Sequence, residues 1–299
     1  MTSKFSPNRS SSLQREDVAS TLLNQTLTAP ELLAPAGSLR NMRYAFAYGA
    51  DAVYAGQPRY SLRVRNNEFS LENLAIGIKE AHALGKKFYV VSNIAPHNSK
   101  LGTYLKDISP VIAMKPDALI MSDPGLIMMV RDAFPEMPIH LSVQANAVNY
   151  ATVKFWQKQG IERVILSREL SLEEIETIRE HVPDMELEVF VHGALCMAYS
   201  GRCLLSGYMN KRDPNQGTCT NACRWSYDVK AGQENETGDI VQANEIDKKG
   251  TAPQMVIPTL GEGTPSTQVF MLEEKEKPGE LMPAFEDEHG TYIMNSKDL

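Results

Sequence analysis

Short apolar runs recur along residues 31–193, and each is followed by polar or glycine positions. The runs are too short for buried helices and are nearly continuous in hydrophobicity, as strands covered on both faces are. Helix-start signals lie between them: Ser171 and Glu174 have the spacing of a capping box, and Asp123 precedes Pro124. The expected strands are ELLAPAG (31–37), DAVYAG (51–56), KFYVVSN (87–93), DALIMSD (117–123), IHLSVQAN (139–146), RVILSRE (163–169) and LEVFVHG (187–193).

Seven strands that alternate with helical segments predict an α/β fold with a parallel sheet, most simply a TIM-like (β/α) barrel. A doubly wound open sheet is the alternative, and it is disfavoured because no glycine-rich phosphate loop follows the first strand. The alternation stops at Gly193, so we expect a barrel that is incomplete at its C-terminal end, as in a fragment. The expected domains are a disordered tail (1–28), a barrel domain (29–230) containing a Cys-rich irregular segment (194–230), an acidic Gly/Pro-rich insertion (231–290) and the start of a further barrel strand (291–299).

The net charge of −7 is unevenly distributed along the chain. Residues 231–299 carry 14 acidic and 5 basic side chains, which leaves residues 1–230 slightly basic. The acidic balance of the whole chain therefore does not exclude a nucleic-acid partner. The sequence has no run of about 18 apolar residues and no apolar leader, so we expect neither a membrane-spanning helix nor a secretory signal. We expect a soluble, cytoplasmic protein whose four cysteines stay reduced.

Polar side chains follow each predicted strand, at the C-terminal end where (β/α) barrels carry their active-site residues. Loops are polar in any protein, which is the competing explanation for any single position. Amides and charges at seven successive strand ends nevertheless predict a polar ligand site. The ends are Gly37–Ser38, Gly56–Gln57, Asn93, Ser122–Asp123, Gln144 with Asn146, Arg168–Glu169 and His192. The candidate catalytic residues among them are His192, Arg168, Glu169, Gln144 and Asn146.

The loop after the second predicted strand, QPRYSLRVRNN (57–67), places Arg59, Arg63 and Arg65 near Tyr60. Arginine interleaved with an aromatic ring can hold an anionic metabolite or stack on RNA bases. A solvated loop with salt bridges is the alternative. As a ligand, a small carboxylate suits such a loop, because the guanidinium fork matches carboxylate geometry.

All four cysteines fall within 28 residues, in the pattern C-x(6)-C-x(15)-C-x(3)-C that begins at Cys196. Four soft thiolates in an irregular segment suit zinc or an iron–sulfur cluster. Structural zinc commonly uses cysteine pairs with about two to four intervening residues, so the looser spacing favours a cluster. Two alternatives stay open: four unrelated thiols, or a cysteine-protease pair of Cys196 as nucleophile and His192 as base.

The segment EVFVHGALCMAYSGRCLLS (188–206) resembles the signature of the collagenase-like peptidase family U32. Within that family, HLSVQANAVN (140–149) and NKRDPNQGTCTNACRW (210–225) are similar to a branch that acts in tRNA hydroxylation. The similarity covers residues 29–299 and corresponds to the N-terminal two-thirds of that branch. The positions that fit the signature are Glu188, Phe190, Gly193, Ala194, Leu195, Cys196, Gly201, Cys203, Leu205 and Ser206.

The resemblance implies a tRNA-modifying iron–sulfur protein involved in prephenate-dependent 5-hydroxylation of the wobble uridine, with tRNA and a small carboxylate metabolite as partners. It implies a [4Fe-4S] cluster, with zinc as the alternative, held by Cys196, Cys203, Cys219 and Cys223. The candidate substrate-binding residues are Arg59, Arg63, Arg65, Lys211, Arg212 and Arg224. Two other functions compete: a U32-type peptidase, and a metal-stabilised scaffold that binds RNA.

Overall fold

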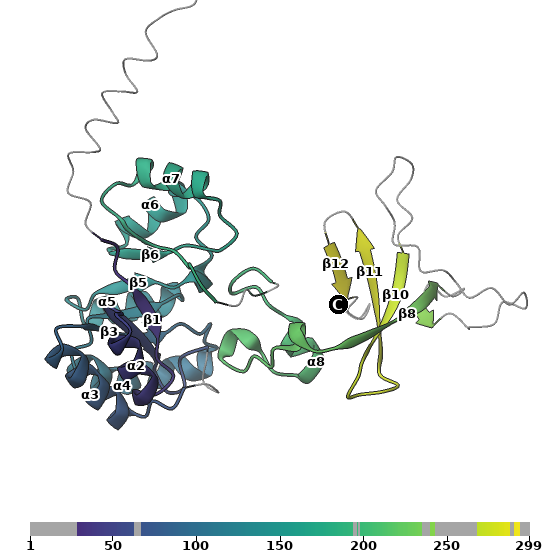
Figure 1. The fold of residues 1–299 in the computed structure, drawn as a ribbon, viewed down its shortest axis with the longest axis horizontal. Coiled ribbons are helices and arrows are strands. Elements are labelled where there is room, and N and C mark those ends of the chain that lie inside the picture. The colour runs from purple at the N-terminus through teal and green to yellow at the C-terminus, as the bar shows by residue number, and fades with distance from the viewer. Residues whose placement is uncertain are drawn as a thin grey trace, which may run out of the picture.

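The computed structural model describes residues 29–62, 67–193, 196, 198–234, 240–242, 268–287 and 290–293. Within these ranges the chain forms a seven-stranded parallel sheet and a five-stranded antiparallel sheet. Figure 1 shows the two sheets at opposite ends of the molecule, with α8 (Leu205–Asn210) between them. The expected tail at 1–28 and the side chains of Arg63 and Arg65 lie outside the described residues.

The strands of the parallel sheet lie side by side in the same order as in the chain, which is the order of a (β/α) barrel. A doubly wound sheet would place later strands on both sides of the first, whereas β1 here lies at one edge. The prediction of an incomplete TIM-like barrel is therefore confirmed: the sheet is a half-barrel. Its strands are β1 (Leu33–Pro35), β2 (Ala52–Gly56), β3 (Lys87–Ser92), β4 (Ala118–Met121), β5 (Ile139–Leu141), β6 (Arg163–Ile165) and β7 (Glu186–Glu188).

Helices connect successive strands, and their ends follow the sequence signals. The Ser171 side chain accepts a hydrogen bond from the Glu174 N–H in a complete capping box, and Asp123 caps the helix that Pro124 begins. Gly85 and Gly160 follow helix ends with φ of 65° and 77°, a conformation that favours glycine. The helices are α2 (Leu39–Ala47), α3 (Leu71–Ala83), α4 (Asn98–Ala113), α5 (Pro124–Ala133), α6 (Tyr150–Lys158) and α7 (Leu172–His181).

Alternate residues of each strand face two different cores. On β3, Phe88 and Val90 belong to the large core between the sheet and the helices. Tyr89 and Val91 point to the opposite face, into a small core inside the curl of the sheet. This two-sided burial explains why the strands are nearly continuous in hydrophobicity.

Most of the predicted strands end earlier than expected, and two of these ends shape the site. The run at 139–146 stops at Leu141, because the Ser142 hydroxyl accepts a hydrogen bond from the Gln144 N–H and starts a short 3-10 helix, η2 (Val143–Ala145). The run at 187–193 stops at Glu188, and Val191 beyond it is 85% exposed. Apolar runs predict strands well but do not locate their ends, because pairing also needs a partner strand.

A network of charged side chains crosses the inside of the half-barrel at the strand starts. Glu31, just before β1, lies 2.7 Å from the Arg163 guanidinium at the start of β6 and 2.8 Å from the Lys87 ammonium. Tyr89 donates a 2.8 Å hydrogen bond to the same carboxylate. Since four strands separate β1 from β6 in the sheet, the Glu31–Arg163 contact forms only where the sheet curls. The network therefore holds the barrel curvature.

The same network predicts an unusual pH dependence through Glu188, which lies 3.6 Å from Arg163. Burial raises the pKa of Glu188 to about 7, and Arg163 only partly offsets it. The neutral Glu188 carboxyl therefore makes its full contribution to the free energy of unfolding below the ordinary Glu pKa of 4.5. This contribution is lost as pH rises through about 7.

Glu188→Gln is thus expected to leave the free energy of unfolding unchanged near pH 4 and to raise it by up to about 3 kcal/mol at pH 8. Chemical denaturation of both proteins at the two pH values measures this difference. His140, whose pKa burial lowers to about 3, contributes to both proteins and cancels. An equal difference at both pH values would contradict the prediction.

The C-terminal part of the chain corrects the expected domain layout. Residues 231–290 contain strands of the second sheet, and Gly290–Ile293 pairs antiparallel with Leu281–Asp287 instead of starting a barrel strand. Only two residues connect these strands, whereas a parallel strand needs a crossover of a dozen or more. The sheet has the order β12-β11-β10-β8-β9. Its strands are β8 (Tyr227–Glu234), β9 (Ile240–Gln242), β10 (Gln268–Glu274), β11 (Leu281–Asp287) and β12 (Gly290–Ile293).

Among the described residues, no helix combines the length and the hydrophobicity that crossing a bilayer requires.

Candidate functional site

The Cys-rich segment packs over the C-terminal ends of the barrel strands. After β3, the Ala95 N–H donates a 2.8 Å hydrogen bond to the Asn215 carbonyl, within the 3-10 helix η3 (Pro214–Gln216). The Gln216 amide lies 3.0 Å from the His97 ring at the start of α4. These contacts hold the segment against the end of the barrel where the sequence predicts chemistry.

Gly201 makes the closest approach between the segment and the strand ends. Its φ is 72°, and a Cβ at this position would lie 2.4 Å from the Gln144 carbonyl oxygen. Both observations require glycine, since a side chain would be strained by the backbone angle and would collide with main-chain atoms. The packing of the segment on η2 therefore depends on this residue.

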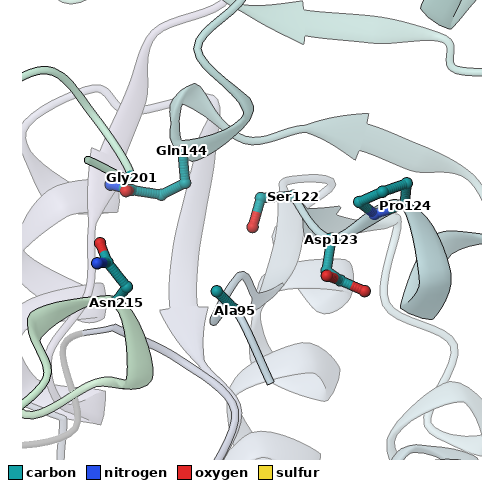
Figure 2. A pocket seen from close by; sticks show the side chains of 7 residues that line it. All are labelled: Ala95, Ser122, Asp123, Pro124, Gln144, Gly201 and Asn215. Carbon is teal, nitrogen blue, oxygen red and sulfur yellow. The ribbon is translucent and has the colours of Figure 1, made fainter. Parts of the chain in front are cut away.

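A small polar cavity of about 110 Å³ lies where the segment meets the strand ends (Figure 2). Figure 2 shows Gln144 and Asn215 on one side of it, Asp123 and Pro124 on the other, and the Ser122 hydroxyl between them. Strand-end residues and segment residues thus form one site. The lining residues are Ala95, Ser122, Asp123, Pro124, Gln144, Gly201 and Asn215.

Local structure fixes the polar side chains of this cavity. Asp123 is the N-cap of α5, and its Oδ1 accepts a 2.8 Å hydrogen bond from the Leu126 N–H. The Ser122 hydroxyl donates to the Asn93 carbonyl at 3.0 Å. Asn215 donates from Nδ2 to the Cys203 carbonyl at 3.0 Å. Each group is therefore oriented before any ligand binds.

The structure does not bring the candidate catalytic residues together in one place. Gln144 lines the small cavity. Arg168 and His192 line a second hollow of about 390 Å³, where the Arg168 guanidinium lies 3.8 Å from the centre of the Phe190 ring. Asn146 ends η2 with a φ of 55° and accepts a 3.1 Å hydrogen bond from Ser167, and Glu169 is exposed.

The candidate substrate-binding cations are equally dispersed. Arg59 pairs with Asp107 on α4 at 2.7 Å and stacks on Tyr60 at 5.6 Å, so a local structural role occupies its guanidinium. Lys211, Arg212 and Arg224 are exposed on the Cys-rich segment.

Sequence reasoning missed the segment's contribution to the cavity. Asp123 and Ser122 were recognisable as a strand end, and the Asp-Pro pair marked a helix start. Gly201 and Asn215 were recognisable only as parts of the segments that resemble the family, 188–206 and 210–225. Neither indicated the cavity, because both lie far along the chain and join it only through packing.

Comparison with known proteins identifies the family. The chain matches the profile of peptidase family U32 over residues 37–299. It belongs to that family. This U32 chain is 76% identical to tRNA hydroxylation protein P of Escherichia coli (strain K12) over 270 residues, which cover 90% of the chain and 59% of the relative. It is 36% identical to the 23S rRNA 5-hydroxycytidine C2501 synthase of the same organism over 203 residues, 68% of the chain and 30% of the relative.

The U32 chain spans about 59% of the length of the first relative. Among solved structures, the U32 peptidase Mk0906 matches with a TM-score of 0.48 and 14% identity, over 56% of this chain and 70% of that one.

The cysteines of this U32 chain lie on the segment that covers the strand ends. All four are free thiols; Cys196 is exposed, and the other three are partly buried. Cys203 precedes α8, and Cys223 lies in η4 (Ala222–Arg224), which packs against α8. Across the part of the chain that the structure describes, no three His, Cys, Asp or Glu side chains are grouped as metal ligands. The donor atoms thus suit a thiolate-bound metal, but their positions do not form a ligand set.

Proposed function

We propose that this protein takes part in the 5-hydroxylation of the wobble uridine of tRNA, in a prephenate-dependent reaction. The observation that carries the proposal is the 76% identity to a tRNA hydroxylation protein over 90% of the chain. A second relative is named for making 5-hydroxycytidine in ribosomal RNA. The two names share hydroxylation of RNA, and the second specifies position 5 of a pyrimidine.

The site suits an RNA substrate. A polar cavity at the strand ends can take one group of the substrate, and exposed Lys211, Arg212 and Arg224 on the adjoining segment can contact phosphates. Phosphate contacts position a nucleic acid but do not read its sequence. Recognition of the base therefore requires contacts beyond these cations.

The small carboxylate co-substrate, prephenate, suits the second hollow. Arg168 stands over Phe190 there, among apolar side chains and beside His192. A guanidinium pairs with a carboxylate through two parallel hydrogen bonds, and the apolar walls accept a carbon ring. Arg59 suits this role less well, because Asp107 already holds it.

We also propose that Cys196, Cys203, Cys219 and Cys223 hold a [4Fe-4S] cluster, with zinc as the alternative metal. Support comes from four free thiols on one segment at the mouth of the half-barrel. Because they are not grouped as placed, binding requires the segment to bring them together. We therefore derive no step of the reaction through the cluster.

Cys203→Ser and Cys219→Ser are each expected to abolish metal loading and 5-hydroxyuridine together. The variants are expressed as the natural full-length protein in a strain that lacks the gene. Iron and acid-labile sulfide are measured on anaerobically purified protein, and the nucleoside in total tRNA by mass spectrometry. Ser226→Ala, at an exposed position within the segment, is the control and is expected to retain both signals.

Two results would contradict the proposal. Stoichiometric zinc without sulfide would make the cysteines structural, and unchanged 5-hydroxyuridine in both variants would separate the thiols from the reaction. Peptide cleavage that depends on Cys196 but not Cys219 would instead support a peptidase. Among the described residues, no hydrogen bond joins Cys196 to His192, so the geometry of this pair does not support a nucleophile and its base.

A further inference from the structure

A tight turn at residues 199–202 holds the Cys-rich segment against the rim of the small cavity. The Arg202 N–H donates a 3.0 Å hydrogen bond to the Tyr199 carbonyl, which closes the turn. Gly201 is the third residue of the turn, and its φ of 72° is the positive angle that a type II turn has at this position. Because Gly201 lines the cavity and lies against the Gln144 main chain, the turn is fixed at the mouth of the half-barrel (Figure 2).

The two ends of this turn present side chains that have no role in the fold. Tyr199 is 58% exposed, although its ring carries a large apolar area. The Arg202 side chain is exposed as well. In the part of the chain that the structure describes, neither side chain makes a hydrogen bond, an ion pair or a ring contact. The rim of the cavity therefore offers an aromatic ring and a cation from the same turn.

The segment that carries the turn is positively charged, although the whole chain has a net charge of −7. Residues 196–226 contain a single acidic side chain, Asp213. Its carboxylate accepts hydrogen bonds from the Asn215 N–H at 2.8 Å and from the Gln216 amide at 3.1 Å, so local structure already occupies it. A polyanion is thus attracted to this segment rather than to the rest of the protein. The basic side chains of residues 196–226 are Arg202, Lys211, Arg212 and Arg224.

Single-stranded RNA matches this combination of an exposed ring and several cations. Proteins hold unpaired nucleotides by stacking the bases on aromatic side chains and by contacting the phosphates with basic ones. A double-stranded RNA keeps its bases stacked on each other. It would therefore offer phosphates to Arg202 but no base to Tyr199.

We propose that Tyr199 stacks on an unpaired base beside the nucleotide that is modified, and that Arg202 contacts a phosphate of the same RNA strand. This inference rests on the proposed function and names two residues that hold its RNA substrate. Stacking tolerates any base, because every base has a flat aromatic face. Tyr199 therefore positions the strand at the mouth of the half-barrel and does not select the base.

The first experiment measures the affinity of the purified full-length protein for an RNA stem–loop with a uridine in its loop. Tyr199→Ala is expected to weaken binding at least about fivefold, because it removes the stacking ring. Tyr199→Phe keeps the ring and is expected to bind within about twofold of the parent. The control is Tyr48→Ala, which removes an 86% exposed ring at the C-terminal end of α2 and is expected to leave the affinity unchanged. Equal affinities of Tyr199→Ala and Tyr48→Ala would overturn the inference.

The second experiment tests the phosphate contact through the salt dependence of binding. Each phosphate contact to a single strand contributes about −0.7 to the slope of log K against log[salt]. Arg202→Met is expected to make this slope less steep by about 0.7. Arg40→Met removes the same charge from α2, where Arg40 lies 5.7 Å from the centre of the Tyr44 ring, and is expected to keep the parent slope. An unchanged slope in Arg202→Met would contradict the phosphate contact.

Two further measurements separate base stacking from other effects of Tyr199. An RNA duplex of the same length is expected to bind Tyr199→Ala and the parent equally, and an equal loss for both RNAs would show that the ring does not act on an unpaired base. Hydrogen exchange at the Ala95 amide, which donates to the Asn215 carbonyl, reports whether the segment stays docked. We expect Tyr199→Ala to keep this protection. A joint loss of protection and RNA affinity would show that Tyr199 acts on the fold, and it would overturn the inference.

The 5-hydroxyuridine assay distinguishes failure of this inference from failure of the proposed function. If the full-length protein restores 5-hydroxyuridine in cells but Tyr199→Ala binds the stem–loop as tightly as the parent, the proposed function stands and the turn is not the RNA contact. If the nucleoside does not depend on the protein at all, the proposed function fails, while the RNA affinities still decide whether the turn binds RNA.

Discussion

Replacing Arg163 by methionine is expected to lower the free energy of unfolding by about 3 kcal/mol. The Arg163 side chain is 11% exposed and pairs with Glu31 before β1 and with Glu186 on β7. Without the guanidinium, the Glu31 and Glu188 carboxyls stay inside the curled sheet with less compensation for lost water. The change is measured by urea denaturation at pH 7.

Removing the Arg163 guanidinium is also expected to raise the pKa of Glu31. Although burial raises the pKa of Glu31, hydrogen bonds from Arg163, Lys87 and Tyr89 outweigh it and lower that pKa to about 2. Part of this stabilisation disappears with Arg163, so the variant is expected to lose less stability than the parent as pH falls from 5 to 2.

Arg43→Met is the matched control for Arg163→Met. Arg43 pairs with Glu80 at 2.6 Å, a contact as short as that of Arg163, but its side chain is 57% exposed. An exposed ion pair contributes about 0–1 kcal/mol. If the two variants lose the same stability, the network does not hold the curvature of the half-barrel.

Gly201→Ala is expected to detach the Cys-rich segment from the strand ends while the half-barrel stays folded. The alanine Cβ would collide with the Gln144 carbonyl at 2.4 Å, and the φ of 72° adds strain of about 1 kcal/mol. The readout is hydrogen exchange at the Ala95 amide, whose hydrogen bond to the Asn215 carbonyl exists only in the docked state. We expect protection of this amide to fall at least about tenfold.

Gly207→Ala provides the control within the same segment. Gly207 lies inside α8, and the nearest atom to an added Cβ is 4.0 Å away. Alanine at this position is expected to leave Ala95 protection unchanged, because the helix tolerates it. A similar loss of protection in both variants would show that docking does not depend on the contact of Gly201 with Gln144.

The strand and helix pattern of the half-barrel was predictable from sequence because its causes are local. Apolar runs such as KFYVVS form strands since both faces are covered, and Ser171 begins a helix because its side chain caps its own backbone neighbours. The ends of strands were less predictable. Ser142 starts η2 and Val191 becomes exposed, since a strand extends only as far as its neighbour pairs with it.

By itself, the sequence determined the α/β class, the order of the elements, the polar strand ends and the four clustered cysteines. Only the tertiary structure decided which polar residues share a cavity. It placed Gln144, Asn215 and Asp123 around one cavity. It placed Arg168 and His192 in another hollow, and it paired Arg59 with Asp107. It also placed the last described strand in a second sheet. The physical reason is distance along the chain: local signals act within a few residues, whereas a site forms from segments that meet only through packing.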